Sequence, residues 1–168
     1  MYCDYCKAAM VEKRTTAAEP YAYVLSGLKD VGLVNIAVYR CPQCSYAAPI
    51  IPRVGELHRL IALALVTQGS PLRGDQVRFL RKHAGLPARQ FANLLGVTPQ
   101  HLSRVENGHR PFGAPTDRLI RAITLTATDC KEARRKLLQI AGRLEKGARR
   151  EQPRPLFRLR GGRWLKAA

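Results

Sequence analysis

The chain has 168 residues and a formal net charge of +17 that is unevenly distributed. Residues 1–72 hold 7 Lys and Arg against 5 Asp and Glu, whereas residues 73–168 hold 22 against 7. Such a basic excess predicts a polyanionic partner, most simply double-stranded DNA, and makes a membrane surface the weaker competitor. The length suffices for one ordinary domain or for two small ones with small cores.

The sequence shows neither an apolar segment long enough to span a membrane nor the pattern of a secretory signal. The longest apolar run is LIALALV at residues 60–66, far short of the roughly 20 residues that span a bilayer. The N-terminus lacks the basic-then-apolar pattern of a secretory signal. We therefore expect a cytoplasmic protein without a membrane partner, and nothing in the sequence indicates a small-molecule substrate.

Four of the five cysteines form two Cys-x-x-Cys pairs, Cys3 with Cys6 and Cys41 with Cys44. Two intervening residues allow a tight turn that points both sulfurs at one ion, so two such turns complete a tetrahedral site. Four thiolates leave no open position for catalysis, which predicts one structural Zn²⁺. Iron in a rubredoxin-like site uses similar turns and stays open. Disulfides conflict with a cytoplasmic location. A redox-active pair would need a helix N-terminus and a βαβ context, and the sequence around neither pair indicates them.

The 34 residues between the two pairs, 7–40, are long enough to hold structure of their own. Residues 21–26 and 34–40 are β-branched and aromatic runs, and 27–32 is a turn-rich connection between them. We expect one small sheet, clamped by zinc, in a four-cysteine β module at residues 1–50.

The next predicted elements are a linker and a helix at residues 51–73. The stretch 45–56 contains Pro49 and Pro52, which disfavour regular structure. The helix that follows has an apolar stripe at Leu57, Leu60, Ile61, Ala64 and Leu65. Packing on the next domain is the favoured role of this stripe, and a dimer seam is the alternative.

Residues 74–108 predict three short helices that end in a DNA-reading one. Their apolar stripes are Val77, Leu80 and Ala84; Phe91, Ala92 and Leu95; and Leu102 and Val105. Gly96 can take the positive φ of a turn, Thr98 can cap the next helix, and Pro99 suits its first position. A three-helix domain without a ligand is the alternative.

The polar side chains of the last helix face outward in this arrangement. Arg104 is suited to guanine and Gln100 to adenine in a major groove. The predicted DNA-binding residues are Arg89, Thr98, Gln100, His101, Ser103 and Arg104.

The C-terminal third predicts two more helices and a basic tail. A fourth helix is expected at residues 115–125, with Leu119, Ile120 and Ile123 inward. A fifth is expected within residues 129–144, completing a DNA-binding domain at 74–148. The tail at 149–168 predicts either a β-hairpin around Gly161 and Gly162 or a disordered basic arm.

The stretch GLPARQFANLLGVTPQHLSRVENG, residues 85–108, resembles the helix-turn-helix of the Xre/Cro-like repressor family. The matching residues are Ala92, Gly96, Val97, Ser103, Arg104, Glu106 and Gly108. The chain departs from the family at one place. The second helix of the family usually begins with Ser-Gln, whereas this chain has Pro87 and Ala88 there.

The order of motifs extends the resemblance. A Cys-x-x-Cys, a short sheet, a Cys-Pro-x-Cys, a linker and an Xre-like helix-turn-helix are similar to the MqsA-like (YgiT-type zinc finger) antitoxins and regulators over residues 3–127. That resemblance implies zinc on the four paired cysteines and base reading by Gln100 and Arg104. It further implies a helix-turn-helix module that dimerises on promoter DNA and a zinc module able to bind a toxin.

The sequence thus predicts an α+β chain: a small zinc-bound β module, an all-α, five-helix Xre/Cro-like helix-turn-helix domain and a basic tail. The expected function is a homodimeric, sequence-specific transcriptional regulator, a repressor, on palindromic operator DNA. The alternative is an antitoxin whose zinc module neutralises a toxin, with DNA binding as autoregulation. A thiol oxidoreductase would need reactive, unligated thiolates, so we expect no enzymatic activity.

Overall fold

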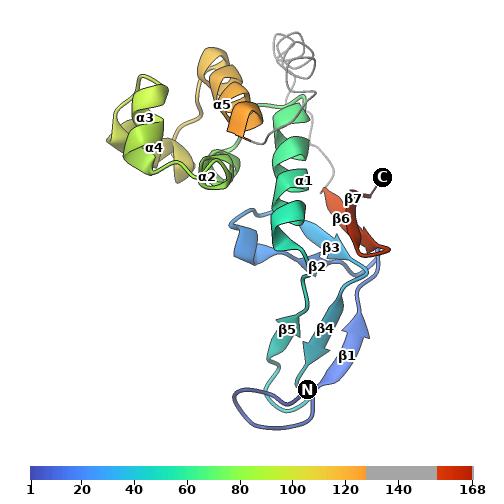
Figure 1. Ribbon diagram of the computed structural model, residues 1–168. Helices are drawn as coiled ribbons and strands as arrows, with labels where there is room; N and C mark the ends of the chain where they lie inside the picture. Colours follow the sequence, from blue (N-terminus) through green and yellow to red (C-terminus); the bar gives the residue numbers. More distant parts are fainter. Residues whose placement is uncertain (128–154, 168) are drawn as a thin grey trace. The chain divides into compact units, whose positions relative to one another are not determined.

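The computed structural model describes residues 1–127 and 155–167, which divide into two compact units (Figure 1). The sheet unit contains residues 1–24, 30–57 and 155–167, and the helical unit contains residues 25–29 and 58–127. The fold is α+β, as predicted, with a β region that carries four cysteines and a region of five helices. No helix in the described ranges combines the length and the hydropathy of a membrane span.

The first sheet of the sheet unit holds the two cysteine pairs at one end. Its strands are β1 (Val11–Arg14), β4 (Ala37–Arg40) and β5 (Ala47–Pro49), antiparallel in the order β1-β4-β5. Val11 at the start of β1 pairs with Arg40 at the end of β4. Because one cysteine pair precedes β1 and the other joins β4 to β5, both pairs meet at the same end of this sheet.

Strand β5 lies within the stretch that the sequence predicted to be an irregular linker, so that prediction was wrong for Ala47–Pro49. The physical reason is its position at the edge of the sheet, where Pro49 pairs with Val38 and its missing N–H is not needed.

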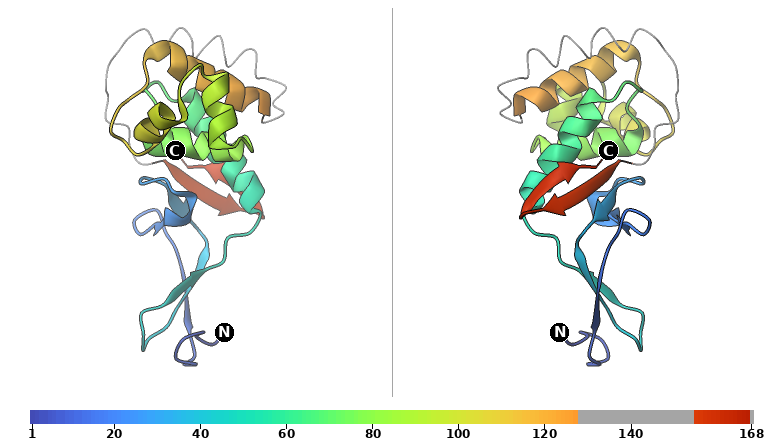
Figure 2. Two further views of the ribbon diagram at one scale, coloured as in Figure 1. Left: turned by 90° about the vertical axis from the view of Figure 1, so that its left-hand side faces the viewer. Right: turned by 90° about the vertical axis from the view of Figure 1, so that its right-hand side faces the viewer.

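The second sheet joins the two ends of the chain. Its strands are β2 (Tyr21–Ala22), β3 (Gly32–Val34), β6 (Leu156–Arg160) and β7 (Arg163–Lys166), in the order β2-β3-β6-β7. Strands β6 and β7 form an antiparallel hairpin, drawn in red in Figure 2, and β6 runs parallel to β3. Of the two alternatives for the tail, residues 156–166 therefore adopt the hairpin.

Two sheets replace the single one that the sequence predicted. The run at residues 34–40 is broken by Asn35, which has a φ of +62° and follows β3 directly. This left-handed residue redirects the chain, so that β3 and β4 belong to different sheets. The strand expected at residues 21–26 is also short, because β2 gives way to a 3₁₀ turn at Val24–Ser26.

The core of the sheet unit contains the single tryptophan. Leu33, Ile36, Val38, Phe157 and Trp164 are each at most 2% exposed. The Trp164 indole N–H donates a hydrogen bond of 2.8 Å to the carbonyl oxygen of Pro52. The hairpin of β6 and β7 is therefore anchored in the sheet unit by apolar burial and by this bond.

The helical unit consists of α1 (Val54–Thr67, whose first turn belongs to the sheet unit), α2 (Gly74–His83), α3 (Ala88–Leu94), α4 (Pro99–Glu106) and α5 (Ala114–Ala127). The predicted apolar positions of α2 to α4 are inward except Ala84, which follows the end of α2 and is only half-buried. Val77, Leu80, Phe91, Ala92, Leu95, Leu102 and Val105 are each at most 8% exposed. The predicted fifth helix at residues 129–144 lies outside the described residues.

The inward face of α5 differs from the prediction, because Leu119 is 40% exposed. Asp117 and Arg121 occupy that face and form an ion pair of 2.6 Å in which Arg121 is fully buried. The guanidinium also donates to carbonyl oxygens after α1, at 2.7 Å each to Gln68 and Ser70. It also donates to the carbonyls of Leu65 and Val66, at 3.3 and 3.0 Å, so carbonyls that α1 leaves unpaired at its end are partly satisfied by a side chain from α5.

Candidate metal centre and nucleic-acid interface

The four paired cysteines meet in one cluster. The sulfurs of Cys3, Cys6, Cys41 and Cys44 all lie within 4.8 Å of one another. Cys3 Sγ is 3.4 Å from Cys44 Sγ, and Cys6 Sγ is 3.3 Å from Cys41 Sγ. Four sulfurs placed ~2.3 Å from a tetrahedral Zn²⁺ would stand about 3.8 Å apart. The cluster could therefore hold a metal such as zinc with small movements of its side chains.

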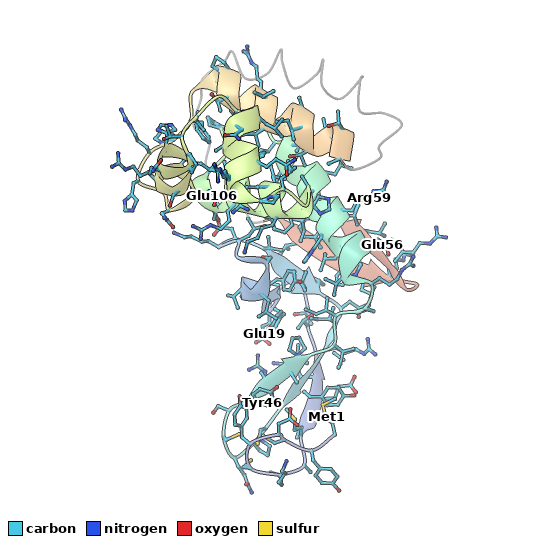
Figure 3. The ribbon with its side chains drawn as sticks, turned by 60° about the vertical axis from the view of Figure 1, so that its left-hand side comes forward. Met1, Glu19, Tyr46, Glu56, Arg59 and Glu106 are labelled. Atoms are coloured by element: carbon cyan, nitrogen blue, oxygen red, sulfur yellow. The ribbon has the colours of Figure 1, made fainter. Side chains whose placement is uncertain are left out.

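Two equivalent turns build this cluster. Lys7 and Ser45, each directly after the second cysteine of its pair, both have a φ of +60°. The N–H of Cys3 donates to the carbonyl of Ala8 at 2.9 Å, and that of Cys41 donates to the carbonyl of Tyr46 at 2.8 Å. Figure 3 labels Met1 and Tyr46 at this end of the sheet. The first cysteine of each pair is buried and the second is exposed.

Backbone amides prepare part of the cluster for negative charge. A hydrogen bond from the amide of Cys6 lowers the pKa of the Cys3 thiol. Burial alone would raise the pKa of Cys41, but the amides of Cys44 and Gln43 lower it to about 6. The Tyr46 amide lowers the pKa of Cys44, yet the hydrogen bond with Cys3 and burial outweigh it and raise that pKa to about 12. A divalent cation would stabilise all four thiolates.

The helix-turn-helix is formed by α3, a glycine turn and α4. Gly96 has a φ of +66°, and the N–H of Val97 donates to the carbonyl of Ala92 at 3.0 Å. The Thr98 hydroxyl accepts a 3.1 Å hydrogen bond from the backbone N–H of His101, and Pro99 occupies the first helical position. The local turn, cap and start that the sequence predicts are therefore all present.

Three predicted contact residues are exposed and turned away from the core. Gln100 and Arg104 are one helical turn apart on α4, opposite the buried Leu102 and Val105. Arg89 is exposed in the first turn of α3. Gln100 and Arg104 thus share one outward face, as an α-helix that enters a groove requires.

The other three predicted residues also hold the local structure. Thr98 caps α4, and the half-buried His101 ring lies 5.4 Å from the Phe112 ring, centroid to centroid. Ser103 Oγ accepts a long hydrogen bond of 3.4 Å from Asn107 Nδ2. These side chains lie at the surface of α4, but part of their bonding capacity is used within the protein.

A buried ion pair that was not predicted from the sequence joins α4 to α2. Glu106, labelled in Figure 3, is 7% exposed. Its carboxylate accepts two hydrogen bonds from the guanidinium of Arg81 on α2, at 2.6 and 3.0 Å. Arg78 adds a 3.4 Å contact to the same carboxylate and donates at 2.6 Å to Asn107. The signal was present, because Glu106 continues the stripe of Leu102 and Val105 at helical spacing.

This ion pair also removes the one acidic charge from the surface of the motif. Glu106 is the only Asp or Glu between Asp75 and Asp117, a stretch with six Lys and Arg. The exposed surface of α3 and α4 therefore carries basic and neutral side chains, the apolar Leu94 among them, and no exposed carboxylate. Such a surface attracts the phosphates of nucleic acid.

Comparison with known proteins agrees with this geometry. Residues 74–137 match a family model described as a helix-turn-helix domain. No curated protein and no solved structure is significantly similar to the chain. The matched domain suggests DNA binding and is typical of non-enzymatic regulators.

Proposed function

We propose that the chain is a sequence-specific transcriptional repressor that binds a palindromic operator as a homodimer. The observation that supports this most is the outward face of α4, where Gln100 and Arg104 stand on a surface free of exposed carboxylates. In a dimer, two copies of α4 would enter successive major grooves about one helical turn apart.

Base reading and phosphate binding would be divided between different side chains. The Arg104 guanidinium can donate two hydrogen bonds to the O6 and N7 of guanine, and the Gln100 amide can pair with the N6 and N7 of adenine. Arg89 would contact phosphate, which fixes the register of the motif without reading sequence. Most of the affinity would come from the basic surface and would weaken as salt rises.

The sheet unit would carry one structural Zn²⁺ on Cys3, Cys6, Cys41 and Cys44. Four thiolates complete the coordination, so the metal would fix the end of the first sheet and supply no open position for a substrate. The functional parts would be a zinc module at 1–50, a linker and helix at 51–73, a DNA-binding domain at 74–148 and a tail at 149–168, whose hairpin shares the sheet unit with the zinc module. The hairpin at 156–166 adds two strands to the sheet of β2 and β3.

The decisive experiment is selection of bound sequences from random duplex DNA by the purified full chain at near-physiological salt. We expect enrichment of a palindrome with half-sites about one helical turn apart. Binding without enrichment would reduce the chain to a charge-driven nucleic-acid binder and overturn the proposed regulator.

A second candidate function is that of an antitoxin. Exposed apolar side chains surround the cysteine end of the first sheet: Met1 (60%), Tyr2 (73%), Tyr5 (77%) and Val11 (62%). An exposed patch of this kind suits a protein partner. A toxin that co-purifies with the native chain, and is lost from a Tyr2→Ser, Tyr5→Ser variant that still binds DNA, would favour this function.

A further inference from the structure

The C-terminal hairpin presents two different faces. Cross-strand partners in an antiparallel pair point to the same side of a sheet. One face therefore carries Phe157 with Lys166 and Leu159 with Trp164, and the other carries Arg158 with Leu165 and Arg160 with Arg163. We name the second set, Arg158, Arg160, Arg163 and Leu165, the arginine face.

The hairpin is held firmly from its other side. Phe157 and Trp164 are 0% and 2% exposed, and β6 pairs with β3 along one edge. Asn35 Nδ2 donates to the carbonyl of Leu159 at 2.7 Å, and an Arg53 guanidinium nitrogen donates to the carbonyl of Gly162 at 3.1 Å. The arginine face is therefore a rigid surface, which loses little conformational freedom when a ligand binds.

The arginine face is exposed and uncompensated. Arg158, Arg160 and Arg163 are all exposed, and within the described part of the chain no carboxylate forms an ion pair with them. Residues 155–167 hold four Lys and Arg and no Asp or Glu. Arg160 and Arg163 are direct cross-strand partners, an arrangement of like charges that destabilises a hairpin. An anionic ligand would relieve this repulsion.

The spacing of the arginines suits an extended polyanion. Residues two apart on a strand are separated by ~6.6 Å, and cross-strand partners by ~5 Å. All three charges thus lie within one Debye length of about 8 Å or little more, and act as one patch. A flat β-ribbon can lie against the backbone or in a groove of duplex DNA.

We infer that the arginine face is a second DNA-contacting surface, which binds phosphates of duplex DNA without reading sequence. The inference rests on the part of the proposed function that assigns duplex DNA as the ligand. It adds a contact from the sheet unit to those of α3 and α4. It also gives the arginines a role. Packing of the buried face does not require them, because neutral polar residues at these three positions would leave that packing unchanged.

The test is a full-chain variant, Arg158→Gln with Arg160→Gln and Arg163→Gln, measured on a random-sequence duplex across a range of salt. Three lost phosphate contacts should make the slope of log K against log salt less steep by about 2 to 3. Affinity for an enriched palindrome should fall by about the same factor as affinity for the random duplex, so the sequence preference should be unchanged. A variant with lysine at all three positions should keep the wild-type slope.

The matched control removes the same charge from the same unit: Lys13→Gln with Arg14→Gln and Arg40→Gln, all exposed on the first sheet. Trp164, the only tryptophan, reports by its fluorescence that the hairpin of the variant is still packed. An unchanged slope in a packed hairpin variant, or an equal change in the control, overturns the inference. Because the duplex is random, this result is independent of whether a palindrome is enriched.

Discussion

Arg104 is the residue on which the proposed base reading depends most. It is exposed, lies one turn from Gln100 on α4, and makes no ion pair with the described residues. Arg104→Ala should cost about 1 to 3 kcal/mol on the selected operator and relax the preference at one base position. The measurement is binding to the operator and to its single-base variants.

Arg89→Ala is the control for this prediction. Arg89 is equally exposed but is assigned to phosphate, so its loss should weaken operator and random DNA by the same factor. If Arg104→Ala also weakens both DNAs equally, Arg104 does not read bases.

Glu106 is expected to matter for stability rather than for contact with DNA. Glu106→Ala would leave the Arg81 guanidinium, whose side chain is 12% exposed, without its carboxylate partner. The carboxylate raises the pKa of Arg81, but a guanidinium stays charged without this help, so the variant leaves a largely buried charge without its ion-pair partner. We expect a loss of about 3 kcal/mol, the low end for a broken buried pair, because the carbonyl of Leu86 still accepts from Arg81 at 3.2 Å.

Urea unfolding of the full chain, followed by helical circular dichroism, measures this loss. Glu19→Ala breaks an equally short pair with Lys13, at 2.6 Å, but both of its side chains are more than 60% exposed. That control should leave the urea midpoint unchanged. Equal midpoints for wild type and Glu106→Ala would show that the buried pair contributes no net stability.

At the scale of elements, α1 and α2 are joined by a small aromatic cluster that should respond to pH. The His58 ring lies 5.6 Å from the Phe79 ring, which stacks on the His83 ring at 6.2 Å. Burial lowers the pKa of His58, and burial together with the charges of His58 and Arg59 lowers the pKa of His83. Both histidines are therefore neutral in the folded protein at neutral pH.

The sign of the pH effect follows from proton uptake. Below the ordinary histidine pKa of 6.5, the unfolded chain binds protons that the folded chain does not bind. The free energy of unfolding of the helical unit should therefore fall as pH decreases through 6.5 towards the lowered folded values. Urea midpoints at about pH 7.5 and at about pH 5 measure this, because the two values lie on either side of the ordinary histidine pKa of 6.5.

A double variant, His58→Gln with His83→Gln, should lose part of this pH dependence. His109→Gln changes an exposed histidine and should keep it. If the double variant and wild type lose stability equally on acidification, other groups control the pH response.

The elements that the sequence predicted correctly are those whose signals are local. Gly96, Thr98 and Pro99 lie within four residues of one another and fix the turn, the cap and the start of α4. Gly74 shows the limit of such signals. It begins α2, at the first residue of the predicted helical stretch, but nothing near it in the sequence signals that a side chain at this position would collide with the backbone of Val105 and Gly108.

Predictions failed where partners distant in sequence decide the structure. Strand β6 pairs with β3, and Asn35 contacts Leu159 across 124 positions. Nothing near either segment signals this parallel pairing, so the tail could be read as a hairpin or as a disordered arm. In the same way, the helical spacing of Leu119 suggested burial, but the Asp117–Arg121 pair takes the inward face of α5.

At the scale of the whole molecule, the two units differ in what would stabilise them. The helical unit has an apolar core formed by α1 to α5, together with the buried pairs of Arg81 and Arg121. The first sheet of the other unit has only three short strands, and β1 is exposed along its whole length. Since so small a sheet buries little apolar surface, metal binding to the four cysteines should supply much of its folding free energy.

Removal of the metal should therefore affect the two units differently. Purified full chain should contain one zinc per molecule, and a chelator should release it. We expect the exposed fraction of Trp164 and the protease sensitivity of residues 1–50 to rise, while the helical circular dichroism of α1 to α5 is largely kept. Restored zinc should reverse both changes, and Cys41→Ser should reproduce the chelated state without chelator. Joint loss of the helical signal and of the sheet unit would contradict two independently stabilised units, because the metal would then support the helices as well.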